Sequence, residues 1–282
     1  MVTGNIPIAK TYKLFINGSF PRSESGRTFS VVDSQGELIA NVSQASRKDL
    51  REAVRAARSA QNAWASRTAY NRGQILYRVA EMIESRKVEF SELLKSFGVN
   101  SRTATREVEE SIQRWVWYAG WSDKYSQILG SVNPVSGPYF NFTVPEPTGV
   151  VGIIPPKEPS MLGLISRLVP VIVSGNTAVV VSEGHSSLTA VTIAEVLATS
   201  DVPPGVVNIL TGDQADLLPW IVGHLDVNAV DISGINQDQD LTVLEEAASN
   251  VKRLISREID EESLELITDF LEMKTVWHPI GR

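Results

Sequence analysis

The spacing of apolar residues divides the chain into two parts, the first of which has helical periodicity. One predicted helical face consists of Leu50, Val54, Ala57, Gln61 and Trp64. Ser46 stands just before this pattern with Asp49 three residues later, which is the arrangement of a capping box at a helix N-terminus. An amphipathic helix is therefore predicted to begin after Ser46.

Further helices are predicted downstream, preceded by a small β region. Apolar residues indicate a second helix around Ile75, Val79 and Met82, and a longer third one marked by Val108, Ile112, Trp115 and Ala119. Before these helices, "KLFINGSF" and "RTFSVVDSQGELIANVSQAS" are typical of strands joined by turns at Asn17-Gly18 and Gln35-Gly36.

From Pro147 onward, short apolar runs replace the long helical faces. The runs "GVVGII", "TAVVVS", "VVNIL" and "NAVDIS" are separated by helical patterns at 159–174, 186–200 and 213–224. Strands spaced in this way must pair in parallel through crossover helices. The predicted fold class is α/β, with a Rossmann-like parallel sheet flanked by helices, a helical N-terminal part and a small β arm.

Ligands of such sheets bind beyond the carboxyl ends of the strands. This rule would gather Pro155–Glu158, Ser182–Gly184 and Ser233–Asn236 around one crevice. Neither a GxGxxG fingerprint nor a phosphate-binding P-loop occurs in the sequence. The prediction of a nucleotide-binding site therefore rests on topology alone.

The C-terminal part is predicted to contain helices followed by a last strand. A long helix is indicated by Leu241, Leu244, Ala248, Val251 and Ile255, and a shorter helical run extends to about Asp269. In "FLEMKTVW", residues alternate between apolar and polar, which predicts a terminal strand.

Composition narrows the classes of function. With 282 residues, 43% of them hydrophobic, and a net charge of -7, the chain is typical of a soluble globular protein. The acidic balance argues against nucleic acid or anionic membranes as partners, and neither a membrane-spanning run nor a signal peptide is recognisable, so we expect a cytoplasmic protein. The basic stripe Arg47, Arg51 and Arg55 is interrupted by acids and is interpreted as a solvated helix face.

Candidate chemistry is sparse. The sequence contains no cysteine, and its three histidines, His185, His224 and His278, lack the spacing of metal ligands. Lys157 could form a Schiff base or hold an anion, but we interpret it as a solvated lysine paired with Glu158.

Five segments carry a resemblance to a known family. These are "LFINGSF", "YAGWSDK" at 118–124, "YFNFTVPEPTGVVGII" at 139–154, "SGNTAVVV" at 174–181 and "PPGVVNILTG" at 203–212. In this order they resemble the NAD-dependent aldehyde dehydrogenase superfamily, and "FLEMKTVW" resembles the strand with which that family pairs subunits. The chain also resembles the cysteine-free second module of two-module aldehyde dehydrogenases.

The resemblance implies that an internal catalytic domain is missing, together with its catalytic cysteine and general-base glutamate. Where the family has Pro-Trp-Asn-Phe-Pro, with an oxyanion-holding asparagine, this chain has "PPKEP" at 155–159. The positions that hold the adenosine ribose correspond to Val181 and Gly184, and the Gly-Ser below the pyrophosphate corresponds to Gly234-Ile235, followed by "NQDQD". No catalytic residue, no metal and no cofactor are therefore expected, although NAD binding stays an alternative.

These observations lead to one domain scheme and one functional hypothesis. We predict that residues 1–134 form the N-terminal β/helical part of a nucleotide-binding-like domain. Residues 135–147 and 270–282 are predicted to form an oligomerisation arm, and 148–269 a Rossmann-like core with C-terminal helices. The resemblance implies a catalytically inactive subunit that forms homo-oligomers, or hetero-oligomers with a full-length aldehyde dehydrogenase. The alternative is NAD-linked aldehyde oxidation or small-anion binding, with a partner chain completing the site. The vestigial crevice would then consist of Pro155, Lys157, Glu158, Ser182, Glu183, Ser233 and Gly234.

Overall fold

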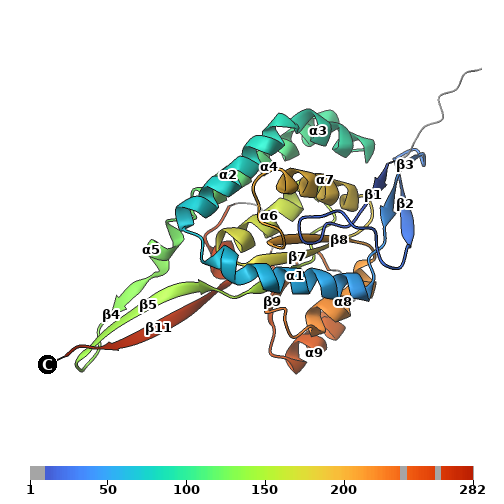
Figure 1. Cartoon of the computed structure of the whole chain (residues 1–282). Coiled ribbons are helices and arrows are strands. Elements are labelled where there is room, and N and C mark those ends of the chain that lie inside the picture. Colours follow the sequence, from blue (N-terminus) through green and yellow to red (C-terminus); the bar gives the residue numbers. More distant parts are fainter. Residues whose placement is uncertain (1–9, 236–239, 258–261, 282) are drawn as a thin grey trace, which may run out of the picture.

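A five-stranded parallel sheet lies at the centre of the protein, as the strand pattern predicts (Figure 1). The computed structural model describes residues 10–235, 240–257 and 262–281. The strands are β6 (Val150–Ile153), β7 (Thr177–Ser182), β8 (Val207–Thr211), β9 (Ala229–Asp231) and β10 (Arg253–Ile255). Their spatial order, β10-β9-β6-β7-β8, places the switch in winding direction between β6 and β9.

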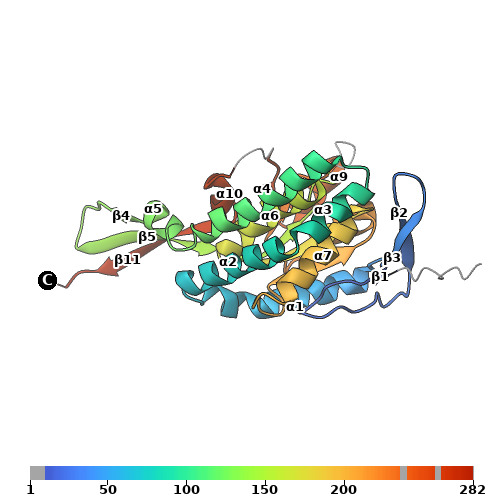
Figure 2. The same ribbon diagram turned by 90° about the horizontal axis from the view of Figure 1, so that it is seen from above.

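Helices cover both faces of this sheet (Figures 1 and 2). One face carries α6 (Ser160–Val173) and α7 (Ser186–Ala198), with α2 (Ala69–Ser85), α3 (Lys87–Ser96) and α4 (Ser101–Ala119) packed outside them. The other face carries α1 (Arg47–Ala65), α8 (Gln214–Gly223) and α9 (Asp240–Ser249). The short helices α5 (Tyr125–Leu129) and α10 (Glu265–Thr268) lie at the edges. Both α3 and α5 were absent from the prediction.

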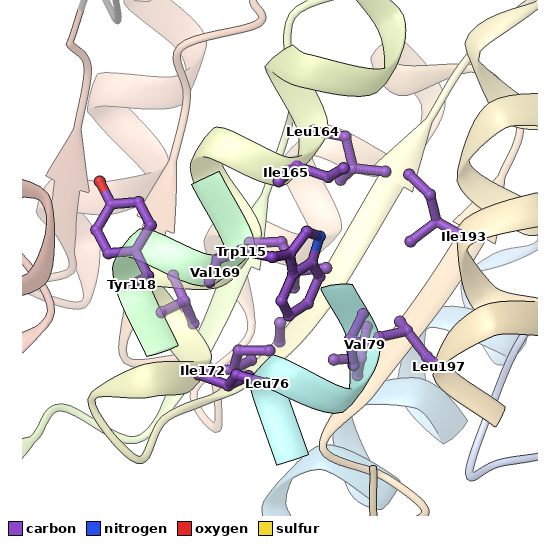
Figure 3. Packing of buried hydrophobic residues seen from close by; sticks show 14 of the residues in the cluster. Leu76, Val79, Trp115, Tyr118, Leu164, Ile165, Val169, Ile172, Ile193 and Leu197 are labelled. Atoms are coloured by element: carbon purple, nitrogen blue, oxygen red, sulfur yellow. The ribbon is translucent and has the colours of Figure 1, made fainter. Parts of the chain in front are cut away.

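Coverage on both faces explains why the central strands have continuous apolar runs. Neighbouring residues point to opposite faces of a strand, so Val179 packs with α1 and α8 while Val180 packs with α6 and α7. On the face covered by α6 and α7, Trp115 of α4 is fully buried among side chains of α2 and α6 (Figure 3).

The start of α1 confirms the predicted capping box. The Ser46 hydroxyl accepts hydrogen bonds from the Lys48 and Asp49 amides at 3.2 and 3.3 Å, and the Asp49 carboxylate accepts one from the Ser46 amide at 2.8 Å. The apolar face of α1 is buried against β7 and β8.

Residues near the N-terminus form a second sheet of three strands. They are β1 (Thr11–Tyr12), β2 (Thr28–Val32) and β3 (Leu38–Ser43). The turn at Asn17-Gly18 is present, with both residues at positive φ of 52° and 73°. The flanking "KLFINGSF" does not form the predicted hairpin of full strands: only Phe15 and Ile16 make isolated bridges, Phe15 with Ile209 of β8.

The third sheet forms an arm that projects away from the body (Figures 1 and 2). It consists of β4 (Ser131–Asn133), β5 (Tyr139–Pro147) and β11 (Leu271–Pro279), in the antiparallel order β11-β5-β4. We call these three strands the arm. The terminal strand predicted from "FLEMKTVW" is thus present, and β4 joins the same sheet although it precedes residue 135.

The predicted long helix through Ile255 is wrong. The helix α9 ends at Ser249, and Val251 adopts a φ of 55°, which is outside the helical region. Ile255 instead belongs to β10, which pairs with β9. Val251 and Ile255 are four residues apart, which is a spacing that fits a helix. In the structure, however, Ile255 lies in a short strand at the edge of the sheet.

Candidate functional site

Main-chain hydrogen bonds join the segments that follow β6 and β9 at the switch point between these strands. The Ile154 amide donates to the Asp231 carbonyl at 2.8 Å, and the Gly234 amide donates to the Ile154 carbonyl at 2.9 Å. Gly234 packs so closely that a Cβ there would lie 2.1 Å from the Pro155 carbonyl oxygen. Only glycine permits this approach, which brings the loops after β6 and β9 into contact.

Lys157 is held by Glu183 and not by Glu158 as the sequence suggested. Its Nζ lies 3.1 Å from Glu183 Oε1, and 47% of the lysine side chain is exposed. Glu158 pairs with His185 instead. Strand-end loops that are distant in sequence therefore meet, and they place Lys157, Glu158 and Glu183 in one polar cluster, which we call the strand-end cluster.

The two serines of the predicted crevice take part in hydrogen bonds within the chain. Ser182 is buried, and its carbonyl accepts a hydrogen bond from the Ser187 hydroxyl at 3.1 Å. The Ser233 amide donates to Asp231 Oδ1 at 3.0 Å, and its hydroxyl accepts from the Arg257 amide at 3.2 Å. These hydrogen bonds join the end of β7 to α7, and the segment after β9 to the segment after β10.

Carboxylates bind the free amides at two helix N-termini facing this region. Glu107 of α4 accepts from the Met161 and Leu162 amides of α6 at 2.7 and 3.2 Å. Burial raises the pKa of Glu107, and the two amide hydrogen bonds oppose that shift. At α8, Glu183 Oε2 accepts from the Gln214 amide at 3.3 Å. These amides would otherwise attract a phosphate or carboxylate ligand.

A buried ion pair that was not predicted from the sequence joins α6 to the end of β9. Arg167 Nη1 and Asp231 Oδ2 lie 3.5 Å apart, with side chains only 2% and 1% exposed. Burial raises the pKa of the Asp231 carboxyl, and the guanidinium opposes this effect. The signal was present, since each charge interrupts an apolar run, "LISRLV" in α6 and "NAVDIS" at β9.

The positions that the resemblance assigns to the ribose offer no polar side chain. Val181 is fully buried in the core facing α1 and α8, and Gly184 lies in an exposed loop at a φ of 60°. The segment after Ile235, with the two aspartates expected at the next helix N-terminus, begins outside the described residues.

The chain matches known proteins over most of its length. The profile described as "Aldehyde dehydrogenase family" matches residues 20–258. Cytosolic aldehyde dehydrogenase 1 of Elephantulus edwardii is 34% identical, with 89% of this chain and 50% of the relative covered. The Ω-crystallin of Enteroctopus dofleini is 32% identical, with 88% and 50% covered.

Solved structures are similar in the same region. An NAD⁺ complex of an aldehyde dehydrogenase from Bacillus cereus has a TM-score of 0.82 and 28% identity, with 87% of this chain and 50% of that chain covered. A putative aldehyde dehydrogenase from Burkholderia cenocepacia has a TM-score of 0.82 and 27% identity, with 86% and 50% covered. The chain thus spans about half the length of the relatives it matches.

Proposed function

The chain belongs to the aldehyde dehydrogenase family, and from that premise we propose that it acts as a structural or regulatory subunit, joining other chains through its arm without oxidising aldehydes itself. The observation that carries this proposal is the arm, which exposes apolar side chains on both faces. Such contiguous apolar surface is typical of an interface.

The first face of the arm combines the alternate residues of β5 with their cross-strand neighbours. Phe142 lies opposite Val132 of β4 and Val276 of β11, and Phe140 is 46% exposed. Between this face and α5 lies a cavity of about 380 Å³, lined by Phe140, Phe142 and Val144. An apolar side chain of a partner would fill it.

The second face and the outer edge add to this surface. Tyr139 and Trp277 pack edge to face with ring centroids 5.8 Å apart, and Trp277 is 59% exposed. Among the described residues β11 has a strand neighbour only on its β5 side, so its other edge presents unpaired backbone groups. Free edges of this kind favour pairing with another chain. The partner would be a second copy or a full-length family member.

The proposal of inactivity rests on the amino-acid composition and on the strand-end region. The 282 residues contain no cysteine, which leaves no thiolate for the family's nucleophilic step. The residues present also do not fit NAD in the way the resemblance implies, because Val181 and Gly184 lack side-chain acceptors. Glu183 already occupies the first amide of α8.

Native mass spectrometry of the protein purified gently from its host tests this proposal. We expect a complex with itself or with a full-length aldehyde dehydrogenase. The double variant Phe140→Ser, Val144→Ser should come out as a monomer, whereas Val88→Ser, which changes an equally apolar residue 70% exposed on α3, should leave the complex intact. A monomeric wild type, or NADH formation from aldehydes by the isolated chain, would refute it.

One observation favours a second candidate function. Lys157 is half exposed beside Glu183, so a small anion or NAD could compete for it, with a partner chain completing the site for NAD-linked aldehyde oxidation. Calorimetry with NAD, NADH and acetate distinguishes the two. Saturable binding that Lys157→Ala abolishes would favour this candidate over an inert crevice.

A further inference from the structure

A large cavity lies away from the strand-end cluster, on the outer side of α1 and α8. Its volume is about 830 Å³, within the ~300–1,000 Å³ range of small-molecule sites. Apolar side chains in its lining include Leu50 of α1, Pro219 and Trp220 of α8, and Leu225 just after α8. Figure 1 shows the two helices on the same face of the sheet.

An aromatic ring and a guanidinium are already stacked in this cavity. The Arg47 guanidinium carbon lies 3.6 Å from the centre of the Trp220 ring, and Trp220 is still 44% exposed. Within the described part of the chain, Arg47 has no carboxylate in ion-pair range. Arg47 thus covers part of the Trp220 ring, and the part of Trp220 that stays exposed offers an aromatic surface on which a planar ring can stack.

The cavity walls carry opposite charges. Arg47, Lys48 and Arg51 lie on the α1 side, and the last two are each 68% exposed. Arg51 has only a 4.0 Å contact with Glu52, so its charge is poorly neutralised. The solvated stripe expected from the sequence therefore borders a cavity.

The opposite wall carries acceptors and one defined donor. Glu246 supplies a carboxylate, and Asp226 supplies a second one that lies 3.7 Å from Arg58 Nε. His224 Nδ1 accepts from the Asp226 amide at 3.1 Å, so the neutral ring carries its proton on Nε2. A ligand that fits both walls has an anion at one end and a ring bearing amino hydrogens at the other.

We propose that this cavity binds a purine nucleoside monophosphate with an exocyclic amino group. The base packs against Trp220, its amino group donates to the Glu246 side, and the phosphate binds Arg47 and Arg51. This site is independent of the arm and of the strand-end cluster, so it stands whether or not the subunit role does.

Calorimetry on the full chain with AMP as probe tests this inference. We expect saturable binding, at least about tenfold weaker for adenosine, which lacks the phosphate, and for ribose 5-phosphate, which lacks the base. Trp220→Ala should weaken AMP binding about tenfold or more, while Trp220→Phe keeps a stacking surface and most of the affinity. Circular dichroism of both variants verifies that they fold.

Two control variants define the outcome that overturns the site. Trp277→Ala removes an equally exposed tryptophan in the arm, and Lys157→Ala alters the strand-end cluster. Neither should change AMP binding. The inference is wrong if AMP does not bind, if a folded Trp220→Ala variant binds it unchanged, or if Lys157→Ala abolishes it. Binding of 1-naphthoate in preference to AMP would also refute the nucleotide assignment.

Discussion

Arg167 of α6 and Asp231 at the end of β9 form an ion pair in the interior, with Nη1 and Oδ2 3.5 Å apart. The pair joins the helix that follows the first central strand to the strand on the other side of the switch point. The Asp231 carbonyl also accepts from the Ile154 amide, so the pair is linked to the segment that follows β6.

Removing one partner of this pair should be costly, because the remaining charge is buried without compensation. Asp231→Ala is expected to lower the free energy of unfolding by about 3–5 kcal/mol. The double variant Arg167→Met, Asp231→Leu should recover most of that loss. Urea unfolding followed by circular dichroism measures both, and a single variant as stable as the wild type would contradict the pair's role.

Asn176 connects the core to the base of the arm. Its Oδ1 accepts from the Gly149 amide at 2.6 Å, and its Nδ2 donates to Ser174 Oγ and to the Phe270 carbonyl, both at 2.8 Å. Asn176→Ala leaves these buried groups without partners and should cost about 1–3 kcal/mol or more.

The matched control for Asn176 is Asn62→Ala on the exposed side of α1. It should change the unfolding free energy by less than about 0.5 kcal/mol. Equal effects of the two substitutions in thermal or urea unfolding would show that the three hydrogen bonds contribute no net stability.

Glu107 should make stability depend on pH. Burial raises the pKa of this carboxyl above 4.5, so the folded state retains its proton at pH values where the unfolded chain has lost it. Its contribution to stability is therefore greatest below pH 4.5 and declines as pH rises through the folded pKa. Comparing unfolding free energies of the wild type and Glu107→Gln between pH 4 and pH 8 isolates this effect.

The sign of that difference is the decisive observation. The wild type should lose stability relative to Glu107→Gln as pH rises, because only the wild type must ionise a buried group. If the wild type instead became more stable relative to Glu107→Gln as pH rises, the hydrogen bonds from the α6 amides, and not burial, would determine the pKa shift of the Glu107 carboxyl.

Burial decides what two tryptophans contribute to stability. Trp115 is fully buried among α2, α4 and α6 (Figure 3), and Trp115→Ala should cost about 3–5 kcal/mol. Trp220 is 44% exposed, and Trp220→Ala should cost less than about 1 kcal/mol. Thermal unfolding of both variants provides the test. Comparable losses of stability would show that Trp220 contributes to the core as much as Trp115 does.

Features that depend on neighbours in sequence could be predicted from the residues alone. The capping box of Ser46 and Asp49 lies within one helical turn, and the central strands are apolar runs because both of their faces are covered. The parallel sheet and the terminal strand followed from these patterns. At β10 the same reasoning failed, because residues 253–255 were too few to show a period.

The sequence by itself determined the α/β fold, the family resemblance and the lack of any cysteine nucleophile, since each is a matter of local pattern or composition. Only the tertiary structure decided which charges meet. Lys157 pairs with Glu183 and not with its neighbour Glu158, Arg167 finds Asp231, and Arg47 stacks on Trp220. Such contacts join residues far apart in the chain, and their energies depend on distance and burial, which exist only after the sheet and its helices have packed.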